Sequence, residues 1–243
     1  MMEIVKVNHA KTEKRKNMNN NFWSNNPLPP YFGKPCTKNG MGGMQDCRGN
    51  FLPSFTTIRD KMRSPAEKAR LAGWRKNKGS EANLACQIGR LGHRQIENYF
   101  NNGDKSCPVI LQRHWEKALP VLNKIHNIRL VESPIFHYYE GYAGRVDCVG
   151  KFDNLPDEMV FEFKFSDRIR IYDEQKLQIA AYTAGLNRHY GHPYNVQINS
   201  GILITITPNE VDITFIDRLE MNKYWKQWQK QVNQFWLQYP NIA

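Results

Sequence analysis

Two apolar, strand-like runs near the middle of the chain each carry an acidic side chain. Asp147 closes the run Gly-Arg-Val-Asp at 144–147, and Glu162 follows fifteen residues later in Phe-Glu-Phe-Lys at 161–164. Alternate residues of an extended strand share a face, so Glu162 and Lys164 project together, roughly 6–7 Å apart, while the phenylalanines take the opposite face. The pattern predicts strands with one apolar face and one face that bears carboxylates and an ammonium group.

These three side chains have the chemistry of a metal site. Two carboxylates that converge from neighbouring strands can hold a hard divalent cation through oxygen ligands, and an adjacent ammonium group can orient or activate a water molecule. Phosphodiester hydrolysis uses this combination. The simpler alternative is that Glu162 and Lys164 lie on a solvated strand face and that Asp147 marks a strand end or a turn.

Helical segments with polar pairs flank the two runs. Apolar residues recur with helical spacing around 84–100, and His93 and Glu97 lie one turn apart on one face of that helix. This pair could add a ligand to a metal pocket from a helix packed beside the sheet. Downstream, Gln178 and Tyr182 share a face of a second helix, where an amide suits contact with a phosphate or positioning of a water molecule. In each helix the alternative is an ordinary polar face.

Taken in order, these elements resemble the RecB-like branch of the PD-(D/E)xK nucleases, and more closely the mitochondrial genome maintenance exonucleases. The segments that carry the resemblance are Pro-Ser-Phe-Thr-Thr-Ile at 53–58, the helix with Gly89, His93 and Glu97, Gly-Arg-Val-Asp-Cys-Val at 144–149, Leu-Gln-Ile-Ala-Ala-Tyr at 177–182, Gly-Leu-Asn at 185–187, and Tyr-Trp-Lys-Gln-Trp at 224–228. The resemblance covers roughly residues 52–240. It implies an α/β fold with a twisted mixed sheet flanked by helices, and a Mg²⁺- or Mn²⁺-dependent DNA exonuclease that acts on single strands with free ends.

The resemblance also implies a role for each site residue. The expected catalytic residues are Lys164, Asp147, Glu162 and Gln178. The expected metal ligands are Asp147, Glu162 and the backbone carbonyl of Phe163. The expected supporting residues are His93, Glu97 and Tyr182, of which either His93 or Glu97 could be a further ligand. The chain departs from the family at Phe165, where threonine or serine is common, and has Glu162 where many relatives have aspartate.

The basic surplus of the chain is confined to its first part. The formal net charge is +11, and residues 1–94 carry 18 Lys and Arg against 6 Asp and Glu, whereas the remainder carries 16 against 17. Lys and Arg neutralise phosphates regardless of sequence, and cations interspersed with a tryptophan are expected of a groove that follows a single strand. The residues expected to contact DNA are Arg59, Lys61, Arg63, Arg70, Trp74, Arg75, Lys76, Lys78 and Arg145. A solvated helical face is the alternative for this basic segment.

The sequence divides into two parts. Residues 1–50 are rich in Asn, Pro and Gly, and we expect a flexible basic extension without regular structure. Residues 51–243 form a single nuclease domain, in which 51–84 is a helical DNA-guiding segment and 85–243 the catalytic core. Ser64 and Pro65 mark a helix start within the guiding segment. In the family that the chain resembles, such helices form part of an arch that admits one strand and excludes duplex.

The remaining expectations concern cofactors, partners and location. The sequence has no Cys-x-x-Cys pair and no cysteine after Cys148, so we expect neither structural zinc nor an iron–sulfur cluster. The absence of a long apolar run argues against a membrane partner. The first residues do not support mitochondrial targeting, so we expect a cytoplasmic enzyme, or one in the host cytoplasm if a phage encodes it. A threading enzyme needs no second subunit, so a monomer is expected.

The last part of the chain completes the predicted core. Residues 196–198 with 201–206 predict a buried strand, and 211–216 predict an alternating strand that returns beside it in a hairpin. Apolar residues at heptad-like spacing from Met221 to Phe235 predict a packed final helix. Two other functions stay open at this point: a structure-specific, resolvase-like endonuclease that uses the same metal site, and a single-strand-binding module that has lost catalysis.

Overall fold

A mixed five-stranded sheet forms the centre of the protein. The computed structural model describes residues 22–77 and 79–242, with the side chain of Arg75 excepted. The strands run in the order β4-β5-β6-β7-β8, and only β6 and β7 are parallel to each other. Their bounds are β4 Ile125–His137, β5 Tyr142–Phe152, β6 Met159–Phe165, β7 Gly201–Ile206 and β8 Val211–Ile216. The predicted α/β class and mixed sheet are confirmed.

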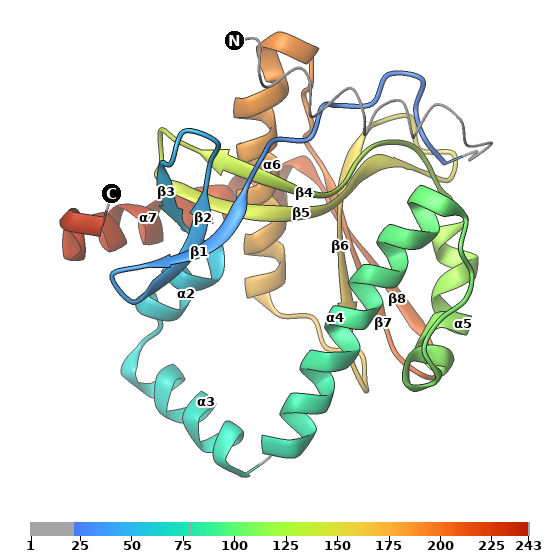
Figure 1. Cartoon of the computed structure of the whole chain (residues 1–243), viewed down its shortest axis with the longest axis horizontal. Helices are drawn as coiled ribbons and strands as arrows, with labels where there is room; N and C mark the ends of the chain where they lie inside the picture. Colours follow the sequence, from blue (N-terminus) through green and yellow to red (C-terminus); the bar gives the residue numbers. More distant parts are fainter. Residues whose placement is uncertain (1–21, 78, 243) are drawn as a thin grey trace.

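Helices cover both faces of this sheet (Figure 1). One face packs against α4 (Gly79–Asn102) and α5 (Gln112–Leu122), and the other against α6 (Asp173–Tyr194) and α7 (Arg218–Gln238). Two short 3₁₀ turns lie at Val109–Leu111 and Pro240–Ile242. The predicted alternation along β6 is observed, because Phe161 and Phe163 are buried on the α4 side. None of the described helices is long and apolar enough to cross a membrane.

The segment after α6 largely follows the prediction. Strands β7 and β8 form the expected antiparallel pair, but residues 196–198 precede β7 as extended chain outside any strand. Helix α7 buries Met221, Trp228, Val232 and Phe235 in the core, whereas Trp225 is only partly buried. The final helix therefore serves packing, as its spacing predicted.

A second, smaller sheet corrects the prediction that residues 1–50 lack regular structure. Its strands β1 (Lys34–Lys38), β2 (Met41–Gln45) and β3 (Phe51–Pro53) are antiparallel neighbours. Gly43 of β2 permits close contact with the neighbouring strand, because a Cβ atom there would lie 2.2 Å from the Leu52 carbonyl oxygen. Residues 1–21 lie outside the described part of the chain, so the prediction for them stays open.

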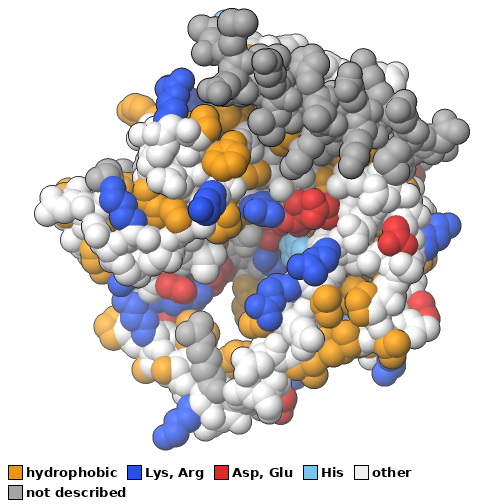
Figure 2. All heavy atoms as spheres, in the orientation of Figure 1, with side chains coloured by type: hydrophobic (Ala, Val, Ile, Leu, Met, Phe, Trp, Pro, Cys, Tyr) orange, Lys and Arg blue, Asp and Glu red, His pale blue; other side chains and the backbone are white. Residues whose placement is uncertain are grey.

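Two helices lead from the small sheet to α4. Helix α2 (Phe55–Met62) is followed by α3 (Pro65–Asn77), which begins as predicted: the Ser64 hydroxyl accepts from the Glu67 N–H at 3.2 Å, and the Glu67 carboxylate accepts from the Ser64 N–H at 2.8 Å. In Figure 1 these helices and the first part of α4 surround an open region below the sheets, and Figure 2 shows that the surface is hollowed there. The segment 51–84 is therefore largely helical, and its role as a guide for DNA stays a prediction.

Candidate active site

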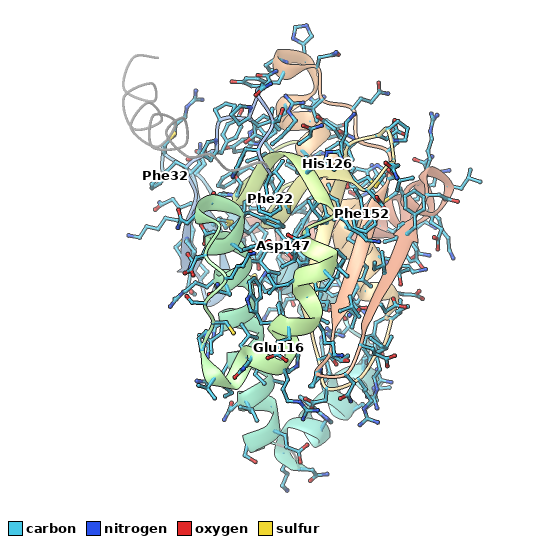
Figure 3. The ribbon with its side chains drawn as sticks, turned by 90° about the vertical axis from the view of Figure 1, so that its right-hand side faces the viewer. Phe22, Phe32, Glu116, His126, Asp147 and Phe152 are labelled. Atoms are coloured by element: carbon cyan, nitrogen blue, oxygen red, sulfur yellow. The ribbon has the colours of Figure 1, made fainter. Side chains whose placement is uncertain are left out.

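The two predicted carboxylates meet inside the protein on neighbouring strands. Asp147 on β5 and Glu162 on β6 are both buried, with exposed fractions of 6% and 1%. Asp147 lies near the centre of the view in Figure 3, surrounded by side chains. Its Oδ2 atom accepts a hydrogen bond of 2.8 Å from the backbone N–H of Phe163, which fixes it against β6. Lys164 Nζ donates to Glu162 Oε1 at 2.5 Å, so the predicted Glu-x-Lys pair shares one strand face.

Helix α4 brings His93 to these carboxylates, as predicted. Its Nδ1 atom lies 3.4 Å from Asp147 Oδ1. The helix can approach β6 this closely because the preceding residue is glycine: a Cβ atom at Gly92 would lie 2.3 Å from the ring of Phe165. Phe165, where the family commonly has threonine or serine, therefore packs against the helix that carries the histidine. Glu97, one turn further along α4, does not join the group of potential ligands among the described residues.

Glu132 on β4 is a site residue that the sequence reasoning missed. Its Oε1 atom lies 3.0 Å from His93 Nδ1. The flanking pairs Val131–Cys148 and Ser133–Val146 set the register of β4 on β5, so Glu132 lies across from Asp147. The signal in the sequence was an isolated acidic residue within an apolar run.

Helix α6 supplies the other two predicted side chains. Gln178 Oε1 accepts from Lys164 Nζ at 3.2 Å, so the amide is a second hydrogen-bond partner of the lysine beside Glu162. Tyr182 is buried one turn later, and its ring packs edge-on against Phe55 at 5.9 Å between centroids. Burial, reinforced by the charges of Glu162 and Asp147, raises the pKa of Tyr182, so its hydroxyl stays protonated.

Buried like charges dominate the electrostatics of the cluster. Burial, together with the charge of Asp147, raises the pKa of Glu162 to about 7, although Lys164 opposes the rise. Burial also raises the pKa of Asp147. Burial alone would lower the pKa of His93, but the carboxylates of Asp147, Glu132 and Glu162 outweigh it and raise the pKa to about 9. A cation placed among these groups would relieve the repulsion.

The donor set fits a divalent cation. One ligand atom from each of His93, Glu132 and Asp147 lies within 4.8 Å of the other two. Glu162 Oε2 is buried and has no hydrogen-bond partner among the described residues, so a strong acceptor is left unpaired beside the group. Carboxylate oxygens suit hard cations such as Mg²⁺ and Mn²⁺, whereas an imidazole favours other transition metals, so the donor set can hold a divalent cation without selecting one. Phe163 contributes its N–H to this arrangement, and ligation by its carbonyl stays a prediction.

The residues predicted to contact DNA lie in two kinds of environment. Arg59 and Arg63 are partly buried and paired with acidic side chains, since Arg63 reaches both oxygens of Glu174 at 2.7 and 2.8 Å and Arg59 contacts Glu67 at 2.9 Å. The exposed members are Lys61, Arg70, Trp74, Lys76 and Arg145. Lys78 and the side chain of Arg75 lie outside the described part. In Figure 2, Lys and Arg side chains surround the acidic and histidine side chains at the centre of the face.

Sequence comparison finds distant relatives. No family model matches the chain. Three proteins named mitochondrial genome maintenance exonuclease 1 are similar to it. The Mus musculus protein is 23% identical, over 87% of this chain and 67% of its own length, and the Xenopus tropicalis protein is 26% identical, over 60% of this chain and 44% of its own length. The Homo sapiens protein is 19% identical, over 76% of this chain and 58% of its own length. The chain thus spans 44–67% of the length of these relatives. The similarity supports the resemblance to a nuclease family.

A solved structure of SSO0001 aligns over 76% of this chain and 77% of that chain, with a TM-score of 0.38 and 16% sequence identity. No shared fold is inferred at that TM-score.

Proposed function

We propose that the protein is a metal-dependent DNA exonuclease of the PD-(D/E)xK type, in the RecB-like branch, and that it degrades single strands from free ends. The observation that carries the proposal is the buried group of Asp147, Glu162 and Lys164, joined by His93 and Glu132. Buried carboxylates whose pKa is raised by burial and by neighbouring charges are typical of functional sites. The similarity to proteins named as exonucleases supports the same class.

The proposed ligands of Mg²⁺ or Mn²⁺ are Asp147, Glu132, His93 and Glu162. A bound divalent cation supplies Lewis acidity that polarises a phosphoryl oxygen and lowers the pKa of a water molecule. The chain contributes the fixed positions of these ligands, because Asp147 is held by the Phe163 N–H and His93 by the close contact of α4 with β6.

Lys164 is the proposed catalytic lysine. Burial opposes its charge, but Glu162 and Asp147 outweigh burial and raise its pKa, so the ammonium group stays protonated at neutral pH. Its proposed role is that of a hydrogen-bond donor that orients the attacking water and stabilises negative charge on the phosphate. Gln178 and Glu162 both accept hydrogen bonds from it. Tyr182 supplies a neutral hydroxyl beside them.

The hollow between α3 and α4 is the proposed guide for the strand. Arg70, Trp74 and Lys76 are exposed on α3, where cations and an aromatic ring can contact phosphates and bases of a single strand. Arg59 and Arg63 have a different proposed role, because their contacts with Glu67 and Glu174 tie the start of α3 to the start of α6. An arch attached in this way selects one strand and requires a free end, since a closed circle cannot thread.

The test is digestion of linear single-stranded, circular single-stranded and linear duplex DNA with Mg²⁺, with Mn²⁺ and with EDTA. We expect metal-dependent loss of the linear single strand alone. Lys164→Ala should abolish cleavage and retain binding, whereas Lys176→Ala, which removes a lysine of α6 paired with Glu220, should cleave normally. Opened circles would identify an endonuclease, and tight binding without cleavage a binding module. Full activity of Lys164→Ala would contradict the site assignment.

A further inference from the structure

A cavity of about 460 Å³ adjoins the catalytic group. The small sheet forms one wall with Thr37, Gly42 and Met44, and the catalytic core forms the other with Gly144, Arg145 and Tyr182. Its volume falls within the range of ~300–1,000 Å³ typical of small-molecule sites. The small sheet thus forms one side of an open depression beside the carboxylates.

Two residues belong both to this cavity and to the surroundings of the catalytic group. Tyr182 lies one turn along α6 from Gln178, which contacts Lys164. Arg145 lies on β5 two residues before Asp147, and its guanidinium group is 3.9 Å from Glu132 Oε2. Its side chain is 45% exposed and this ion pair is long, so the guanidinium group can bind an incoming anion. A strand whose phosphate occupies the catalytic group would therefore place an adjacent nucleotide at the cavity.

The wall formed by the small sheet is held in place. Met44 and Leu52 pack with Phe136 and Ala143 of the main sheet in a separate buried cluster. The Gly42 carbonyl oxygen accepts hydrogen bonds from the Ser54 N–H at 3.1 Å and from the Thr57 hydroxyl at 2.7 Å. The cavity is therefore preformed, which reduces the entropy lost when a ligand binds.

The lining selects against a second phosphate. Among the described residues that line the cavity, Arg145 alone is charged, and it lies on the side of Asp147. The opposite wall is lined by two glycines, by Thr37 and Ser54, and by Pro35, Cys36 and Met44. The Ser54 hydroxyl is already hydrogen-bonded to Thr57, which leaves the hydroxyl of Thr37 as the main polar side-chain group on this wall. An uncharged wall with so few polar side chains suits a flat, neutral ring better than a second phosphate.

We propose that this cavity, the base cavity, receives one nucleobase of the strand under cleavage while Arg145 binds the neighbouring phosphate. The proposal rests on the proposed nuclease function and adds a substrate subsite to it. The small sheet then acts with the core to set the position of the scissile phosphate. A base taken up in this way, without readout of its identity, makes cleavage tolerant of sequence but dependent on the presence of a base.

The test places a single abasic residue at successive positions of a short labelled single strand and measures binding in EDTA for the full chain. We expect one position at which loss of the base weakens binding about fivefold or more, the lower end of what one stacked base contributes. Thr37 is an exposed residue of the cavity lining, so a tryptophan ring at this position should obstruct the cavity: binding of the intact strand should weaken and the effect of that abasic position should vanish. Thr214→Trp, on the edge strand β8, is the matched control and should keep the abasic effect.

The outcomes separate this proposal from the proposed function. Equal binding at every abasic position, or an abasic effect that persists in Thr37→Trp, would overturn the base cavity even if the wild-type chain degrades linear single strands with Mg²⁺. Failure of the wild-type chain to bind or cleave single strands would overturn the nuclease function itself. Thermal unfolding of both tryptophan variants, compared with wild type, establishes that each retains its fold.

Discussion

The contact between Gly92 and Phe165 gives a sharp test of how His93 is positioned. Replacing a helical glycine by alanine gains about 0.5–1 kcal/mol when the methyl group has room. At Gly92 it has none, because its Cβ atom would lie 2.3–2.5 Å from three carbons of the Phe165 ring. At Gly89, three residues earlier on the same helix, no heavy atom lies within 4 Å of the added Cβ atom. Both alanine variants therefore gain the same stability from helix propensity, and they differ only in whether the added methyl group has room.

Overpacking of a well-filled interior costs about 1–3 kcal/mol. Gly92→Ala should therefore have a free energy of unfolding lower than that of Gly89→Ala by about this amount, which corresponds to a difference in Tm of roughly 2–12 °C for a domain of this size. Either the partly buried Phe165 ring or α4 has to move to make room for the methyl group, and His93 is displaced if the helix moves. Because a displacement of ~1 Å can lower a rate about 100-fold, cleavage should fall strongly in Gly92→Ala and stay near wild type in Gly89→Ala.

Thermal unfolding and single-strand cleavage measure the two effects. Gly92→Ala combined with Phe165→Leu should recover part of both losses, since a smaller side chain makes room for the methyl group. Equal stability and equal activity of Gly92→Ala and Gly89→Ala would refute the argument that this contact positions the histidine.

Three further predictions follow from the site and its surroundings. Glu132→Gln should weaken Mn²⁺ affinity about 10- to 100-fold, and an unchanged affinity by titration calorimetry would remove Glu132 from the metal site. Neutralising Arg70 and Lys76 together should reduce the salt dependence of single-strand affinity by about 1.4 in log–log slope, because each phosphate contact contributes ~0.7; an unchanged slope would exclude α3 as the guide. Burial lowers the pKa of His189 to about 4, so the unfolded chain takes up a proton near pH 6.5 before the folded one does. The histidine therefore has no pH-dependent effect on stability above about pH 6.5 and increasingly destabilises the folded state as the pH falls toward 4, so the Tm of His189→Gln should fall less than that of wild type between about pH 7 and pH 5.

The sequence predicted those parts of the site that local periodicity determines. Strand alternation placed Glu162 and Lys164 on one face, and helical spacing placed His93 and Glu97 together on one face of α4, although only His93 joins the group of potential ligands among the described residues. Glu132 could not be found in this way, because its position depends on which strand pairs with β5 and in which register. The partners of Arg63 were equally hidden, since Glu174 lies 111 residues further along the chain. The spacing of residues within one helix or strand does not reveal which distant residues they contact.

The same distinction between local and long-range information applies to the fold. The β7–β8 pair and α7 follow from turn residues and apolar spacing within short segments. The small sheet was missed because its glycines have two physical uses that composition does not separate: they favour turns, and they let neighbouring backbones approach closely. At Gly43 the second use applies, as the adjacent Leu52 carbonyl oxygen leaves no room for a side chain.

The backbone at Glu132 links function to stability. Its φ angle is 44°, in the left-handed region, where a residue with a Cβ atom is disfavoured by about 1–2 kcal/mol and glycine is not. Glycine at this position would therefore relieve strain within β4, but it would also remove the carboxylate that faces His93 and Asp147. A search for more thermostable variants would be expected to select Glu132→Gly, and the selected protein would have exchanged a proposed ligand for relief of backbone strain.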